Sequence, residues 1–400
     1  MESIQIRMQK LVDKDEYEEA IHILNQSPLE HSNASVLSIA SYAYLQLSEI
    51  DKARKFVSKA LSIDNNNTLA KLTLAKIKLR ISDNDEAYRI TNELFKNTND
   101  IDVIATHSTA LRVTNRLPEC VKLCNNELKN YPNNVILNIN KGIIELSKGN
   151  VQSALVSLRI AYQEKPHLSQ IWQILLKLSY QNHDFDLSIE LSHKLVDQGK
   201  DVLENLKIMA NCYYEKKQIN KAVFTYKKII KMDAMIPSVW NNLGLMYHSQ
   251  SKIKHAIECY NKSLEIEEDY VPALNGLGMS YLDQNNPKKA LRVLNEAIEL
   301  DKKNPDVCNN IARAYFASGD LENAFKYYQV ALTIDPKKII TIENFVSLLV
   351  QLYDENKKNE LLKLLNDKSY EVFLFKSPRL TILLAIYYWN NQEFKKSKQH

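Results

Sequence analysis

Cys120 and Cys124 have the spacing in this sequence that most directly suggests chemistry. Side chains four residues apart lie on one face of a helix, where two thiolates could bind a metal ion. No second pair of ligands lies nearby in the sequence, and both cysteines fall at core positions of a helical pattern. We therefore interpret them as buried structural thiols and predict no metal site.

Other candidates for catalysis are equally isolated. The sequence contains no glycine-rich phosphate loop and no His-Glu-x-x-His metal motif. His248 and His255 flank an expected hairpin turn, where an ordinary surface role is the simpler interpretation. The Asp and Glu residues occupy solvent-facing helix positions and form no pair suited to acid–base catalysis. We predict no catalytic residue, no cofactor and no enzyme activity.

The composition predicts helices joined by short connections. The 400 residues are 45% hydrophobic and 25% charged but include only 7 Gly and 10 Pro, too few turn residues for a large β-sheet protein.

The net charge is only +4, so we interpret lysine pairs such as Lys227-Lys228 as solubilising and predict no nucleic-acid partner. The sequence has no secretory signal and no apolar run of about 20 residues. With five scattered cysteines, it predicts a cytoplasmic protein without a membrane span.

A small residue recurs every 33 or 34 positions and organises the chain. The next apolar residue follows four positions later, and a second small residue often follows at the seventh, which is one face of a helix. Another helical stripe precedes each small residue, so each period predicts a helical hairpin that must stack on its neighbours to bury its apolar face. The small residues are Ala20, Ala53, Ala87, Cys120, Ala154, Ser188, Ala222, Ala256, Ala290 and Ala324.

These hairpins resemble the tetratricopeptide repeat, whose signature runs Trp-x2-Leu-Gly-x2-Tyr, Ala-x3-Phe, Ala and Pro. The resemblance covers essentially the whole chain and implies an all-α, right-handed superhelical α-solenoid of about eleven to twelve stacked helical hairpins. The stretch 305–338 carries nearly the full signature, in Ile311-Ala312, Tyr315, Ala324, Tyr328, Ala331 and Pro336.

The repeats are expected to occupy residues 1–338, with a degenerate repeat and a terminal partial or capping unit in 339–400. In that last segment Lys358 replaces the small residue, and the partial unit starts near Pro378. We expect that either the final helix is a cap or the chain is part of a longer protein. The predicted repeat starts lie near 1, 34, 68, 101, 135, 169, 203, 237, 271 and 305.

In this family the first helices of the hairpins line a concave surface that commonly holds a peptide or a partner helix. Asn241, Asn275 and Asn309 are 34 residues apart, so we expect their carboxamides to stack as a ladder along this groove. The arrangement resembles the asparagine ladder in the repeat domain of O-linked N-acetylglucosamine transferases. The alternative is that these amides satisfy neighbouring loops. Amides can bind a peptide backbone without reading its sequence. The rest of the predicted groove is Lys207, Asn211, Asn242, Asn310, Arg313 and Asn344.

Part of the groove resembles the carboxylate clamp with which some family members hold chaperone C-termini. Lys207, Asn211 and Asn242 match three of its five positions, but the two that should be basic are Pro272 and Gly276. The clamp is therefore incomplete. The alternative is that these residues contact some other acidic group.

The repeat from residue 135 departs from the pattern. Its core positions hold Asn138, Lys141, Gly142 and Glu145, while an apolar stripe follows a separate face. Either this helix is rotated in the stack, which we favour, or the stripe is an exposed patch that awaits a partner. The stripe consists of Ile136, Ile139, Ile143 and Leu146.

Taken together, the sequence predicts a scaffold that binds a peptide or partner protein in its concave groove. The alternative is the substrate-recognition arm of a larger enzyme, such as a glycosyltransferase or sulfotransferase, with its catalytic domain beyond residue 400. A third possibility is a homodimer that stacks through the end repeats.

Overall fold

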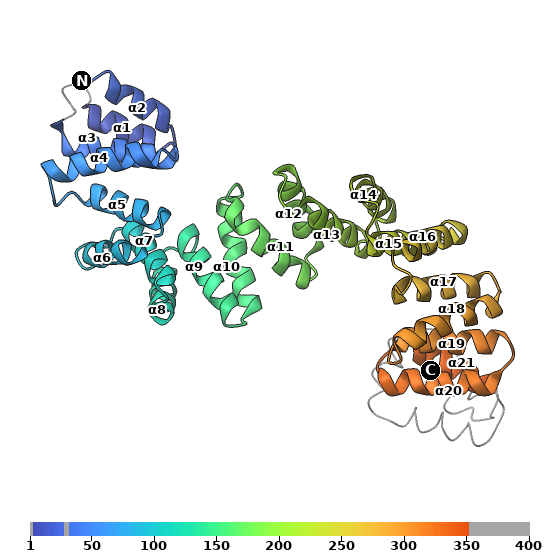
Figure 1. Cartoon of the computed structure of the whole chain (residues 1–400). Helices are drawn as coiled ribbons and strands as arrows, with labels where there is room; N and C mark the ends of the chain where they lie inside the picture. The colour runs from blue at the N-terminus through green and yellow to red at the C-terminus, as the bar shows by residue number, and fades with distance from the viewer. Residues whose placement is uncertain (1–2, 28–31, 352–400) are drawn as a thin grey trace, which may run out of the picture. The chain divides into compact units, whose positions relative to one another are not determined.

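The computed structural model describes residues 3–27 and 32–351, and all of their regular structure is helical (Figure 1). These residues form 21 α-helices and one short 3-10 helix, without a β-strand. The predicted all-α array of helical hairpins is therefore confirmed. Lys358 and Pro378, in the predicted terminal unit, lie outside the described residues. No helix in the described ranges is long and apolar enough to cross a bilayer.

The chain divides into two compact units, residues 1–183 and 184–400. The first contains five helical hairpins and the first helix of a sixth. Its elements are α1 (Ile4–Val12), α2 (Tyr17–Asn25), α3 (Ala34–Gln46), α4 (Ile50–Ile63), α5 (Thr68–Arg80), α6 (Asn84–Phe95), α7 (Ile101–Val113), α8 (Leu117–Glu127), α9 (Val135–Ser147), α10 (Val151–Glu164), η2 (Ser169–Ile171) and α11 (Trp172–Gln181).

The second unit begins with α12 and continues through four hairpins to α21, the last helix that is described. Its elements are α12 (Phe185–Asp197), α13 (Val202–Glu215), α14 (Ile219–Met232), α15 (Pro237–Ser249), α16 (Ile253–Ile266), α17 (Val271–Asp283), α18 (Pro287–Leu300), α19 (Pro305–Ala317), α20 (Leu321–Ile334) and α21 (Ile339–Gln351).

Local sequence signals start the first helix of many hairpins. Asn33, Asn67 and Asn134 each cap a helix by accepting a hydrogen bond from a backbone N–H of the first turn. In α15 and α19 a proline is the first helical residue, where its missing N–H costs nothing and its fixed φ suits the helix. These signals place helix starts at regular intervals.

The turn inside each hairpin contains one residue in the left-handed conformation. Only two of these turn residues are glycine, Gly149 and Gly319, at φ +80° and +82°. The others are held there although a side chain makes this conformation costly by about 1 kcal/mol or more, which shows how strongly packing fixes the turn. They are Asp15, Ser48, Ser82, Asn115, His183, Lys217, Ser251 and Asn285.

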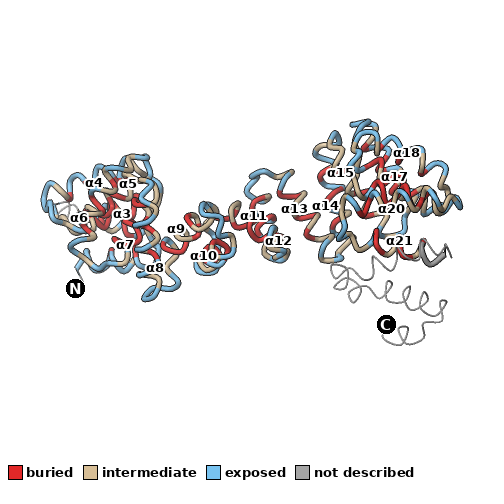
Figure 2. Tube along the Cα trace, turned by 90° about the horizontal axis from the view of Figure 1, so that it is seen from below, coloured by how far each residue is buried: buried red, intermediate tan, exposed pale blue. Residues whose placement is uncertain are grey.

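The core lies between facing helices, as the stripes of buried residues in Figure 2 show within each unit. All ten recurring small residues have 0% exposure, so each marks a point where helices come close together. Large side chains then fill the space between layers. Tyr260 is packed so tightly that a Cβ atom added at Gly276 would lie 2.5 Å from its ring, and at Gly244 2.8 Å.

The rotated-helix interpretation of the repeat from residue 135 is wrong. Asn138 and Gly142 are buried at their core positions, and Gly142 lies against Leu158. The Asn138 amide donates to the carbonyls of Pro132 and Asn134, at 2.8 and 3.0 Å, which is how a polar side chain is accommodated there. The apolar stripe consequently stays near the surface, with Ile136 exposed and Ile139, Ile143 and Leu146 half-buried.

His107 is a buried ionisable group in the first unit. Its ring stacks against Tyr88 and Phe95, with centroids 5.7 and 4.9 Å apart. The Thr91 hydroxyl donates to the Ala87 carbonyl, so the imidazole Nδ1, 3.0 Å from Thr91 Oγ1, is the donor in that contact. Burial lowers the pKa of His107 to about 4.

We predict that His107 makes the first unit sensitive to mild acid. The folded pKa lies below the unfolded value of about 6.5, so the stabilisation is complete above pH 6.5 and is lost as the pH falls toward 4. Between these two pH values the free energy of unfolding falls by about 1.4 kcal/mol for each unit by which the pH is lowered. Urea titrations at several pH values would show this slope in the wild type and a shallower one in His107→Phe. Replacement of the exposed His22 by Gln is the control; an equal slope in His107→Phe would contradict the assignment.

Candidate functional site

Four asparagines connect three successive first helices of the second unit. Asn310 Nδ2 on α19 donates to Asn275 Oδ1 on α17 at 2.9 Å, and Asn344 Nδ2 on α21 donates to Asn309 Oδ1 on α19 at 3.1 Å. Asn309 Nδ2 reaches Asn310 Oδ1 at 3.4 Å. The expected stacking of equivalent residues 34 apart is therefore replaced by bonds between residues 35 apart, because each amide leans back to the preceding repeat.

Burial separates these amides into two kinds. Asn309 and Asn310 are 5% and 6% exposed, so they hold neighbouring helices together and are hidden from a ligand. Asn275 and Asn344 are half-buried. Among the described residues, none accepts a hydrogen bond from Asn275 Nδ2 and none donates one to Asn344 Oδ1, so one donor group and one acceptor remain for a partner.

Arg313 extends this network toward the preceding repeats. Its Nη1 donates to Asn310 Oδ1 at 3.1 Å, and its Nη2 lies 3.6 Å from Asp283 Oδ1. The other oxygen of Asp283 lies 2.8 Å from His248 Nε2. Polar contacts thus run from α15 through α17 and α19 to α21, and His248 serves as a link in this chain of contacts.

A small hollow of about 230 Å³ lies beside this network. It brings together Arg313 and Asn344, two residues of the predicted groove. The sequence did not identify the others, although Phe316 could have been found because it lies three residues after Arg313 on the same helix face. The remaining lining residues are Leu282, Phe316, Ala317, Tyr328 and Ser347.

A second group of predicted residues gathers around Tyr226. The fully buried Tyr226 hydroxyl donates to Asn211 Oδ1 and accepts from Asn242 Nδ2 at 3.0 Å. Asn241 Nδ2 donates to Asn242 Oδ1 at 3.2 Å. Asn241 is half-buried, and its Oδ1 accepts no hydrogen bond from the described residues. The structure shows no hydrogen bond between Asn241 and Asn275.

The residues of the partial carboxylate clamp form contacts within the chain. Lys207 forms an ion pair with Glu204 at 2.7 Å, while Asn211 and Asn242 share the Tyr226 hydroxyl. Any side chain at Gly276 would displace Tyr260. Packing therefore keeps the clamp incomplete.

Asn140 is a member of the same pattern that sequence reasoning missed. It is the sixth residue of α9, as Asn242, Asn310 and Asn344 are of α15, α19 and α21. Its Nδ2 donates to Ser108 Oγ at 2.8 Å in the preceding repeat, and its Oδ1 accepts from Arg112 Nε at 2.7 Å. Asn140 could have been found from the sequence, because it occupies the same repeat position as Asn242, although it lies three repeats earlier in the chain.

Cys120 and Cys124 are buried with their sulfur atoms 4.0 Å apart. The Cys120 thiol also lies 3.1 Å from the Ser108 carbonyl. The contact with Cys120, together with burial, raises the pKa of the Cys124 thiol, which disfavours the thiolate needed for metal binding. Within the described ranges, no cluster of three or more His, Cys, Asp or Glu side chains could hold a metal ion.

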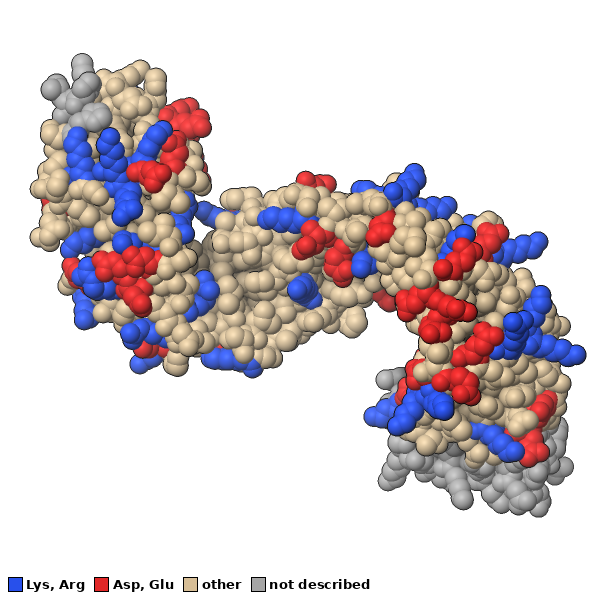
Figure 3. All heavy atoms as spheres, in the orientation of Figure 1, with Lys and Arg blue, Asp and Glu red and all other residues tan. Residues whose placement is uncertain are grey.

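Charges of both signs are distributed over the visible face of each unit (Figure 3). Many charged side chains of the described residues form ion pairs along a helix or between neighbouring helices, as Lys71 does with Glu93 at 2.7 Å and Lys338 with Asp306 at 2.6 Å. This face carries no continuous basic surface of the kind that follows a phosphate backbone.

Comparisons with known proteins give two kinds of match. Family models described as the tetratricopeptide repeat match residues 34–67, 208–234, 236–303 and 275–339. Among solved structures, a chain of the APC/C hetero-tetramer Cut9-Hcn1 is similar at 15% identity and a TM-score of 0.45, covering 86% of this chain and 83% of that chain. Yeast Tom70 is similar at 14% identity and a TM-score of 0.49, over 98% of this chain and 89% of that chain. MamA is similar at 22% identity and a TM-score of 0.37, over 42% of this chain and 93% of that chain. No curated protein matches the sequence.

We predict that Asn310→Ala destabilises the second unit by about 1–3 kcal/mol, because it leaves the buried Asn309 Nδ2 without an acceptor. Asn275→Ala is the matched comparison and should cost less, since it removes only the bond from Asn310 Nδ2, whereas Asn310→Ala removes that bond and those from Asn309 and Arg313. Thermal unfolding followed by circular dichroism would measure both. Equal stability of Asn310→Ala and the wild type would show that the network contributes nothing.

Proposed function

We propose that this chain, which carries tetratricopeptide repeats, is a scaffold that holds an extended peptide segment of a partner protein along α15, α17, α19 and α21. The observation that carries the proposal is the row of half-buried amides with open hydrogen-bonding groups: Asn241 Oδ1, Asn275 Nδ2 and Asn344 Oδ1. A peptide backbone offers the complementary N–H and C=O groups at every residue.

The buried amides of Asn309 and Asn310 form hydrogen bonds with two members of this row, Asn275 and Asn344. Asn309 and Asn310 also bond to each other, so the amides of Asn275 and Asn344 are held in one orientation before a ligand arrives. Preorganisation of this kind lowers the entropic cost of binding. Because the contacts are to backbone groups, the row would select an extended segment and leave its sequence largely unread.

Selectivity would come from the hollow beside Arg313. Its apolar walls, Leu282 and Phe316, suit a small apolar side chain, while Arg313 and Asn344 add polar groups at its edge. The guanidinium is already engaged by Asn310 and Asp283, so we expect it to orient a peptide carbonyl and not to serve as the main source of affinity. Such binding would be on the order of micromolar, about −8 kcal/mol.

The test is affinity capture from a native lysate with the purified full chain. We expect Asn241→Ala/Asn275→Ala/Asn344→Ala to reduce the captured partner at least tenfold while helicity stays unchanged. Asn309 is left intact because its replacement would test stability and not binding. The control replaces the exposed Asn125, Asn126 and Asn130 by Ala. Capture of the same partners in the same amounts by the triple variant would refute the site.

A further inference from the structure

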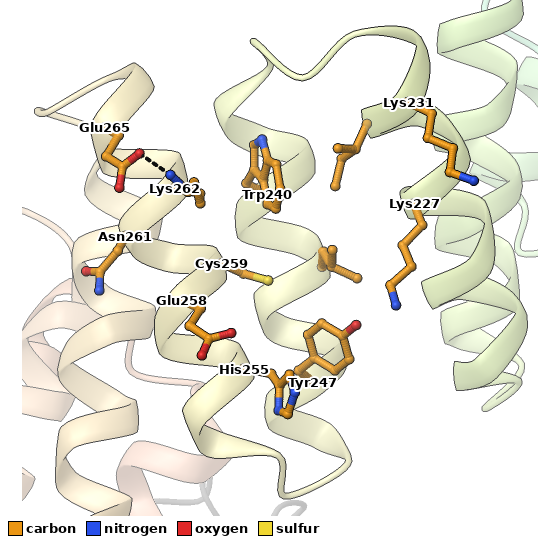
Figure 4. Close-up of a pocket in the computed structure, with 12 residues that line it drawn as sticks. Lys227, Lys231, Trp240, Tyr247, His255, Glu258, Cys259, Asn261, Lys262 and Glu265 are labelled. Atoms are coloured by element: carbon orange, nitrogen blue, oxygen red, sulfur yellow. Dashed lines mark hydrogen bonds and ion pairs between the residues drawn. The ribbon is translucent and has the colours of Figure 1, made fainter.

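A larger hollow of about 680 Å³ lies between α14 and α16, above α15 (Figure 4). Pockets that bind ligands typically measure roughly 300–1,000 Å³, so this one has room for a substantial group. Its floor and walls are mainly apolar. They consist of Ile230, Trp240, Leu243, Tyr247 and Cys259.

Cys259 contributes a small side chain to the lining of the hollow. It lies three residues after Ala256, and the equivalent positions after Ala290 and Ala324 hold Val293 and Tyr327. Tyr327 packs against the hydrophobic cluster that includes Leu274 and Ile311, whereas Cys259 carries a much shorter side chain at the equivalent position. The Trp240 N–H donates to the Ala234 carbonyl at 2.8 Å, which anchors the half-buried indole beside the space.

This hollow is separate from the amide row. Trp240, Leu243 and Tyr247 follow the spacing of one face of α15, since they lie three and seven residues apart. Asn241 and His248 lie on another face of the same helix. A segment in the hollow would therefore contact α14 and α16, the second helices of their hairpins, and would leave the amides of α15, α17, α19 and α21 open.

The two rims of the hollow differ in charge. Lys227 and Lys231 are exposed on α14 and form no ion pair with any described residue; the Lys227 ammonium lies 5.7 Å from the Tyr247 ring centroid. On α16, Lys262 is neutralised by Glu265 at 2.5 Å (Figure 4). Glu258 on that rim likewise has no ion pair within the described ranges. The α14 rim is therefore positive and the α16 rim negative.

We propose that this hollow is a second docking site, which binds a partner's peptide segment through one large apolar side chain and adjacent acidic residues. The apolar side chain enters between Trp240, Leu243 and Cys259, where its burial supplies the main driving force. The acidic residues lie against Lys227 and Lys231, and a basic residue on the other side of the anchor lies against Glu258. The opposite charges of the rims fix the direction in which the segment binds.

Three pools of 11-residue synthetic peptides test the site on the immobilised full chain carrying Asn241→Ala/Asn275→Ala/Asn344→Ala, so that the amide row, which is proposed to bind peptide backbones of any sequence, does not retain them. The first has a central Phe or Leu with two Glu on one side and two Lys on the other, in both orders, within Gly and Ser. The second replaces the anchor by Ala, and the third replaces all charged residues by Ser. We expect the first pool to be retained at least tenfold more strongly than either of the others, and less strongly as salt is added.

Variants then locate the binding. Lys227→Glu/Lys231→Glu should weaken retention at least tenfold, whereas the charge-matched control Lys288→Glu/Lys289→Glu on α18 should not change it. Cys259→Tyr, which fills the hollow with the residue that a later repeat uses, should abolish retention. Each variant is made in, and compared with, the chain that carries Asn241→Ala/Asn275→Ala/Asn344→Ala.

Several results would overturn the proposal. It fails if no pool is retained, if the alanine-anchor pool is retained equally, or if retention survives both Lys227→Glu/Lys231→Glu and Cys259→Tyr. Self-association of the chain that Cys259→Tyr removes would assign the hollow to a second copy instead. If Cys259→Tyr proves misfolded by circular dichroism, the charge-reversal pair, whose side chains are exposed, decides alone.

Discussion

The close approach of helices at one small residue in each repeat is the constraint on which this structure depends. Ala, Ser or Cys stands at each of the ten positions from Ala20 to Ala324, and all are fully buried. A larger side chain there would push the helices apart and cost about 1–3 kcal/mol. Since one hairpin cannot enclose its own apolar face, stability arises at the interfaces between neighbours, and large residues such as Tyr226, Tyr260 and Tyr328 fill those interfaces.

The same regularity determines where polar groups can act. The sixth residue of α9, α15, α19 and α21 is asparagine, and each of these amides bonds to the repeat before it. Asn309 and Asn310 satisfy buried hydrogen-bonding groups and also fix the orientation of Asn275 and Asn344, whose remaining groups face outward. The hollow between α14 and α16 is lined by Cys259, where a later repeat carries Tyr327 at the equivalent position.

Much of the fold could be predicted from the sequence, because the spacing of the small residues determines both the helix period and the hairpin length. The proximity of Asn275, Asn309, Asn310 and Asn344 followed from the same spacing. The hydrogen bonds between residues 35 apart and the burial of Asn309 could not be predicted. Both depend on how far each repeat is displaced along its neighbour. The register of α9 was also mispredicted, because Asn138 looks incompatible with a core until the carbonyls of Pro132 and Asn134 are known to accept from it.

Native-state hydrogen exchange of the full chain carrying Ala290→Leu tests the central claim most directly. Ala290 is fully buried in α18, so the added volume should separate α18 from α17 and from the adjoining helices. The account predicts lost amide protection in α17 and α18, smaller losses in α16 and α19, and unchanged protection in α3 and α4, because each repeat contacts only its neighbours. Unchanged protection in α17 and α18, or an equal loss in both units, would contradict it.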